Sequence, residues 1–148
     1  MSESSTQSYK ISNEAWAFLA LRVWLAIRWL FAGLEKFGSP GNYSFENYYA
    51  KVSGMAGGIV ENSIIPLWAA KVFAIPMGYI MLLLASTILL GVKLRISLIV
   101  SLLMYVGLSL GLMAVDEQHG IAWLGIHVIL SMTALKMVEH AKWVLWKD

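Results

Sequence analysis

The sequence predicts an all-α integral membrane protein, an antiparallel bundle of four transmembrane helices with an outer interfacial helix between the first two spans. Three observations support this prediction. Of the 148 residues, 59% are hydrophobic and 14% are charged, which is more apolar surface than a soluble core of this size could bury. Apolar stretches recur with the length needed to cross about 30 Å of hydrocarbon. Short connections join the last three stretches, and they favour antiparallel neighbours.

We expect the whole chain, 1–148, to form one membrane domain. The expected spans are 15–34, 64–92, 96–115 and 121–138. Residues 1–13 form a polar tail that lacks the basic start and apolar middle of a signal peptide. Pro76 removes a backbone donor inside the second span, so a kink is expected there.

Charged residues in the connections predict the orientation. Lys93 and Arg95 lie between the second and third spans, whereas Asp116 and Glu117 lie between the third and fourth. Positive charge in short loops marks the cytoplasmic side of a membrane. The pattern therefore predicts a multi-pass membrane protein with both termini in the cytoplasm.

The connection between the first two spans is too long for a plain loop. Apolar and aromatic residues recur in it at helical spacing, and they are Phe45, Tyr48, Tyr49, Val52 and Ala56. This spacing predicts a short amphipathic helix lying on the outer membrane surface. The glycines that follow are expected to end it, and they are Gly54, Gly57 and Gly58.

Composition excludes several kinds of chemistry. The chain has no cysteine, which excludes a thiol nucleophile, an iron–sulfur cluster and c-type haem attachment. Lysine and arginine form no block, so a nucleic-acid partner is not expected. Haem ligation by two histidines fits poorly, because His127 has no second histidine at its depth. We expect no metal site and no intrinsic cofactor.

Ionisable groups inside a membrane are costly, so each is a candidate functional residue. Arg28, Lys71 and His127 come from three spans, and each lies about 9–10 Å below the outer boundary at the rise of an α-helix. Glu35 shares a helical face with Arg28, and Lys36 would stand at the entrance. Together they predict a polar pocket for an anion or a quinone head group. The alternative is that the two cations snorkel separately and His127 is a satisfied core residue.

Two further sets of residues suggest structural roles. Arg22 shares a helical face with Gly33 and Lys36 and lies in the inner half of the first span, so we expect it to face the bundle. Gly107 and Gly111 give the third span a face on which helix backbones can approach closely. That face could pack inside this bundle or, as an alternative, join two copies in a homo-oligomer.

Two segments resemble the DoxX/DoxD-like family of four-helix membrane proteins. They are RVWLAIRWLFAGLEKFG in the first span and LLGVKLR at the end of the second. The matching positions are Arg22, Gly33 and Lys36 in the first segment and Gly91 and Arg95 in the second. Two features common in the family are missing: a glutamate in the second helix and a glycine-rich end closed by Ser-x-Asp.

The resemblance implies a membrane subunit of a quinone-linked oxidoreductase complex, with a quinone as cofactor and other membrane or redox subunits as partners. A small sulfur anion at the outer face would be its substrate. Two alternatives stay open: a non-catalytic accessory subunit of a larger membrane complex, and a small-anion transporter. The sequence identifies no catalytic residue.

Overall fold

The computed structural model describes residues 11–146, and this part of the chain is all-α as predicted. A hairpin of two very short strands, β1 (Gly38–Ser39) and β2 (Asn42–Tyr43), joins the first two helices. The 3-10 helix η1 (Val138–His140) follows the last α-helix. The five α-helices are α1 (Asn13–Phe37), α2 (Phe45–Glu61), α3 (Leu67–Leu90), α4 (Leu94–Ala114) and α5 (Gln118–Lys136).

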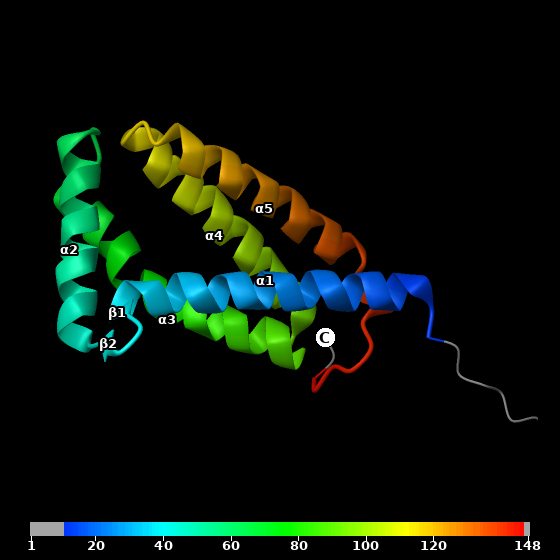
Figure 1. Ribbon diagram of the computed structural model, residues 1–148. Helices are drawn as coiled ribbons and strands as arrows, with labels where there is room; N and C mark the ends of the chain where they lie inside the picture. The colour runs from blue at the N-terminus through cyan, green and yellow to red at the C-terminus, as the bar shows by residue number, and fades with distance from the viewer. Residues whose placement is uncertain (1–10, 147–148) are drawn as a thin grey trace, which may run out of the picture.

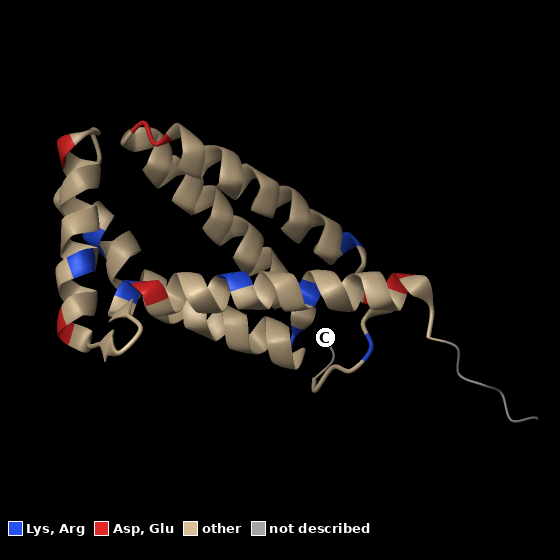
Figure 2. Cartoon of the chain, in the orientation of Figure 1, with Lys and Arg blue, Asp and Glu red and all other residues tan. Residues whose placement is uncertain are grey.

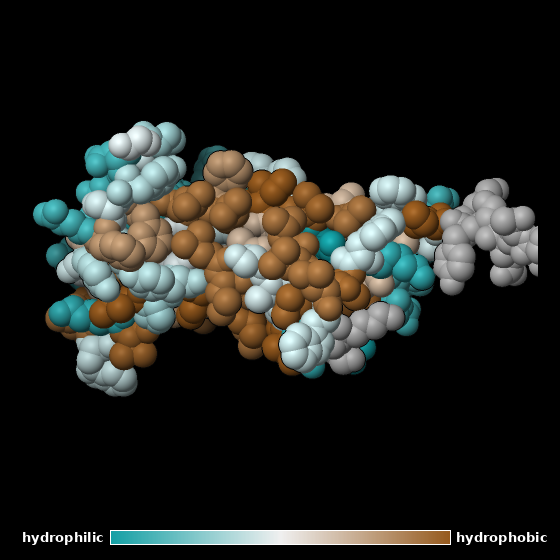
Figure 3. Space-filling model, turned by 90° about the horizontal axis from the view of Figure 1, so that it is seen from below, coloured by the Kyte–Doolittle hydropathy of each residue, from teal (hydrophilic) through white to brown (hydrophobic). Residues whose placement is uncertain are grey.

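Three of the described helices, α1, α3 and α4, are long and apolar enough to cross a membrane. They indicate a multi-pass membrane protein. The side chains around the helices are largely apolar, and Figure 3 shows a broad hydrophobic band between two more hydrophilic ends. In Figure 2, long uncharged stretches fill the middle of α3, α4 and α5. The expected fourth span, α5, is not among the three, because its 19 residues include Gln118, His119, His127 and Lys136.

The helices form two pairs, α1 beside α3 and α4 beside α5. The pairs meet near the turn between α3 and α4 and diverge towards α2 (Figure 1). The starts of α1 and α4 and the ends of α3 and α5 therefore lie at one end of the molecule. The α2 helix and the turn between α4 and α5 lie at the other end.

Helix α2 lies across the end of α1 and the start of α3 (Figure 1). Ser44 caps it by accepting from the backbone N–H of Asn47 at 3.0 Å. The prediction that three glycines end this helix is wrong, because it continues through them to Glu61. A glycine costs a helix about 1 kcal/mol without breaking it, and the buried stripe continues past them to Ile59.

A tyrosine of α2 hydrogen-bonds to the backbone of α3 next to its proline. Helix α3 stays helical across Pro76. The buried Tyr48 hydroxyl donates to the carbonyl of Ile75 and accepts from the backbone N–H of Gly78 at 3.2 Å. Gly78 makes room for it, since a Cβ there would lie 2.5 Å from the Tyr48 ring. Burial raises the pKa of Tyr48, so its hydroxyl stays protonated and able to donate.

Candidate functional site

A cavity of about 330 Å³ lies between the two helix pairs where they diverge, and all five α-helices contribute to its lining. Most of its wall is apolar. Helix α3 contributes Phe73, Met77 and Met81, which recur every four residues on one face. Helix α2 covers the outer side with Met55 and Ile59. Such a cavity, apolar with a few polar groups, is the usual form of a small-molecule site.

The end of α1 brings charged groups to this cavity. Arg28, Glu35 and Lys36 all line it. The carboxylate of Glu35 lies 3.7 Å from the ammonium of Lys51 on α2, which also donates to the Glu35 carbonyl at 2.9 Å. Arg28 and Lys36 form no ion pair with any described residue. The cavity therefore has two cations whose nearest acid is already paired.

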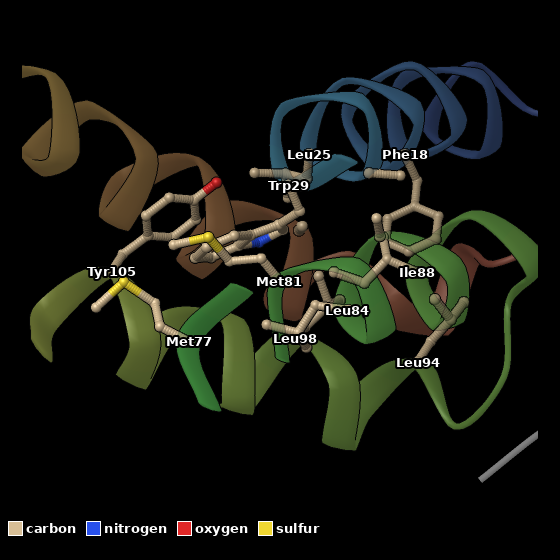
Figure 4. Close-up of a cluster of buried hydrophobic side chains, with 13 residues drawn as sticks. Phe18, Leu25, Trp29, Met77, Met81, Leu84, Ile88, Leu94, Leu98 and Tyr105 are labelled. Atoms are coloured by element: carbon tan, nitrogen blue, oxygen red, sulfur yellow. The ribbon is translucent and has the colours of Figure 1, made fainter. Parts of the chain in front are cut away.

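The inner wall of the cavity is aromatic. Tyr105 of α4 stacks on Trp29 of α1, with ring centroids 4.2 Å apart. The indole N–H of Trp29 donates to the Ser101 hydroxyl at 2.8 Å, and that hydroxyl lies 3.5 Å from the hydroxyl of Ser131. Figure 4 shows Tyr105 and Trp29 at one end of the buried cluster, with Met77 and Met81 beside them.

The Tyr105 hydroxyl is buried and has no hydrogen-bond partner among the described residues. His127 lies beside the Tyr105 ring, with centroids 5.2 Å apart. Its Nδ1 lies 2.8 Å from the carbonyl of Trp123, so Nδ1 is the donor in that contact. The His127 Nε2 is also buried and unpaired within residues 11–146.

The structure brings together only part of the predicted polar layer. Arg28, Glu35 and Lys36 line the cavity, and His127 lies directly behind its wall. Lys71 is exposed on the first turns of α3 and does not line it. Sequence reasoning missed Trp29 and Tyr105. One signal could have found Tyr105, because it continues the four-residue spacing of Ser97 and Ser101 on the small-residue face of α4.

Arg22 lies at the opposite end of the bundle and is buried, with 5% of its surface exposed. Its guanidinium donates to the carbonyls of Lys142 and Trp143 at 3.2 Å each, and to that of Leu89 at 3.4 Å. It therefore joins the first helix to the end of α3 and to the last described segment, 141–146, which we call the C-terminal strap.

Two of the other matched residues, Gly33 and Gly91, also lie at packed positions. A Cβ on Gly33 would approach Leu82 to 2.8 Å, and one on Gly91 would approach the Val144 backbone to 2.9 Å. Gly91 has a φ of 72°, the left-handed conformation that ends α3. Arg95 is exposed and lines a groove with Glu139 and Trp146.

The small-residue face of α4 is used inside the chain. A Cβ on Gly107 would lie 3.2 Å from the Phe73 ring, and Gly111 lines the cavity. This arrangement agrees with packing inside the bundle. Within the described residues, no group of three or more histidines and acids could hold a metal ion.

Comparison of the chain with protein-family models, with curated proteins and with solved structures finds no match in any of the three. The likeness to the DoxX/DoxD-like proteins rests on the matched residues given above, and the argument for function rests on the cavity.

Proposed function

We propose that this chain is a membrane subunit of a quinone-linked oxidoreductase, similar to the DoxX/DoxD-like proteins, and that its cavity binds a quinone head group. One observation supports this most directly: an apolar cavity with hydrogen-bond donors at both its charged edge and its aromatic wall. A quinone has an apolar ring and tail, and its carbonyl oxygens need donors. Arg28, Lys36 and Tyr105 all line the cavity, and each can offer a donor.

The membrane arrangement that goes with this proposal has four spans. Helix α5 packs along α4, which is itself apolar enough to cross a membrane. Its outward side chains are apolar, and Trp123, Ile126 and Ile129 are exposed. Its polar His127 and Ser131 are buried. A helix with polar groups inside and apolar groups outside is suited to lipid, so α5 is the proposed fourth span.

The orientation follows from the charges at the two ends. Lys93, Arg95 and Lys136 lie at the end opposite α2, whereas Asp116 and Glu117 lie in the turn between α4 and α5. The proposal therefore places Arg22 and the C-terminal strap on the cytoplasmic side of a bacterial or archaeal inner membrane, and the cavity in the outer leaflet.

Thiol labelling tests this orientation. The native chain has no cysteine, so single cysteines at Val92 and Gln118 give a clean background. An impermeant thiol reagent added to intact cells should label position 118 and leave position 92 unlabelled. The reverse pattern would invert the proposed topology.

Ligand binding tests the function. We expect the purified protein in nanodiscs to bind a short-chain 1,4-naphthoquinone, and Arg28→Ala to weaken that binding about tenfold, since a hydrogen bond to a charged group is worth about 1.5–3 kcal/mol. Lys136→Ala is the matched control, because Lys136 is exposed at the far end of α5. No binding by the wild-type protein would remove the quinone proposal and favour the accessory subunit.

A small sulfur oxyanion is a second candidate ligand for the same cavity. The observation that favours it is the pair of cations, Arg28 and Lys36, left without an acid partner among the residues that the structure describes. Thiosulfate should then compete with the quinone for wild-type protein. Its flux into liposomes, rather than competition, would support the small-anion transporter.

A further inference from the structure

We infer that Tyr105 is a specificity-determining residue, whose hydroxyl binds a second acceptor at the inner end of the cavity. The site would then select a ring with acceptors at both ends over a ligand with one polar end. This inference rests on the proposed function, because it concerns which ligands the same cavity accepts.

The first argument is the state of the Tyr105 hydroxyl. The side chain is 2% exposed and lines the cavity, and its oxygen has no partner in residues 11–146. Buried polar groups are nearly always hydrogen-bonded, and leaving one unpaired costs about 1–3 kcal/mol. A ligand acceptor beside this hydroxyl would remove that cost.

The second argument is that the Tyr105 ring is held in place. On one side it stacks on Trp29, whose own N–H is bound to Ser101 at 2.8 Å. On another side lies His127, which is fixed through Nδ1 by the carbonyl of Trp123 at 2.8 Å. Stacked aromatic neighbours restrict the ring, so the hydroxyl is a fixed donor. Figure 4 shows it pointing away from α4, to the side on which α1 lies.

The third argument is the separation of the polar groups. Lys36 lies in the last turn of α1, seven residues or about 10 Å along the helix beyond Trp29, whereas Tyr105 stacks on Trp29 itself. The apolar side chains of Met77 and Met81 belong to the same buried cluster as Tyr105. A ligand with one polar end can satisfy Lys36 and leaves the hydroxyl unpaired. A para-quinone has oxygens at opposite ends of its ring and can satisfy both.

The experiment compares two probes with two carbonyls and with one. They are a short-chain 1,4-naphthoquinone and the corresponding 1-tetralone, which keeps the fused carbon skeleton and one carbonyl and has CH2 groups in place of the second carbonyl and the ring double bond. Binding of each is measured for wild-type protein in nanodiscs and for Tyr105→Phe, which keeps the ring and its stacking. We expect wild-type protein to prefer the quinone about tenfold, the effect of one hydrogen bond of roughly 1.4 kcal/mol, and Tyr105→Phe to lose that preference.

Lys36→Ala serves as the comparison variant, because Lys36 lines the cavity at a distance from Tyr105. It should weaken both probes by the same factor and keep the preference of the wild type. The affinities of wild-type protein for the two probes are already a test by themselves. The inference can therefore fail even if Tyr105→Phe does not fold. Equal wild-type affinity for both probes, or the same preference in Tyr105→Phe, would overturn the role of Tyr105 and leave the quinone proposal standing. Binding of neither probe would overturn the quinone proposal and the inference with it.

Discussion

At the end of the bundle where α3 turns into α4, the two terminal nitrogens of the buried Arg22 donate to three backbone carbonyls, and its Nε has no partner among the described residues. At the end beneath α2, Arg28 is exposed, and the buried Tyr105 hydroxyl has no partner in the described part of the chain. The two arginines lie on the same helix, and only Arg22 is held by backbone carbonyls. A polar group inside a membrane protein is costly unless it is paired. The end held by Arg22 is therefore best explained by assembly, and the end with the free Tyr105 hydroxyl by a ligand.

The largest effect is expected at Arg22. In Arg22→Ala the carbonyls of Leu89, Lys142 and Trp143 lose their donor, so the free energy of unfolding should fall by about 3 kcal/mol or more. Thermal unfolding in detergent measures it. Arg28→Ala is the matched control, since it should leave unfolding within about 0.5 kcal/mol of wild type. Equal losses for the two arginines would abolish the contrast between the ends.

Gly91→Ala tests the same end from the other side. Gly91 has a φ of 72°, and a Cβ would lie 2.9 Å from the Cα of Val144 in the C-terminal strap. Left-handed backbone and close contact together should cost about 2–3 kcal/mol. Gly54→Ala is the control, because a Cβ there meets nothing within 4 Å. If both alanines are tolerated, the strap is not packed as described.

Two tyrosines give a smaller effect at the outer end. Tyr48 donates to the Ile75 carbonyl and accepts from the Gly78 N–H, whereas Tyr105 is unpaired. Tyr48→Phe should therefore lower the free energy of unfolding by about 1–2 kcal/mol. Tyr105→Phe should leave it unchanged or slightly raised in protein without ligand. Denaturation of the two variants side by side decides it, and a larger loss for Tyr105→Phe would mean that its hydroxyl has a partner.

The smallest effect concerns the ion pair beside the cavity. Glu35 and Lys51 join α1 to α2 at 3.7 Å, and both side chains are well exposed. Exposed pairs contribute about 0–1 kcal/mol, so Glu35→Gln should barely change unfolding. The same variant should leave quinone binding within about twofold of wild type, because the Glu35 carboxylate is paired with Lys51 and not with Arg28 or Lys36. A large loss of binding would make Glu35 a ligand group, as the sequence had suggested.

The sequence predicts the helices well, because length and apolar composition decide them. It also leads to Arg28, Glu35 and Lys36, since residues three, four or seven apart share a helical face. Lys71 does not join this group in the structure. The depth of a residue in the membrane does not determine which way its side chain points around the helix. Lys71 lies two residues before Phe73, so it points about 200° away from the face that lines the cavity.

Other parts of the site could not be predicted from sequence. The pairing of Glu35 with Lys51 depends on how α2 lies across α1. The contact of Trp29 with Tyr105 depends on which helices become neighbours. Both contacts arise from packing between elements far apart along the chain, and no local sequence pattern predicts that packing.

The bonds of Arg22 have a consequence for how the protein is made. Arg22 enters the membrane with the first helix, but its acceptor Lys142 lies 120 residues later in the chain. During synthesis this arginine lacks those partners until segment 141–146 has been made. A nascent chain arrested before the C-terminal strap would expose an unpaired charge that quality-control proteases can reach.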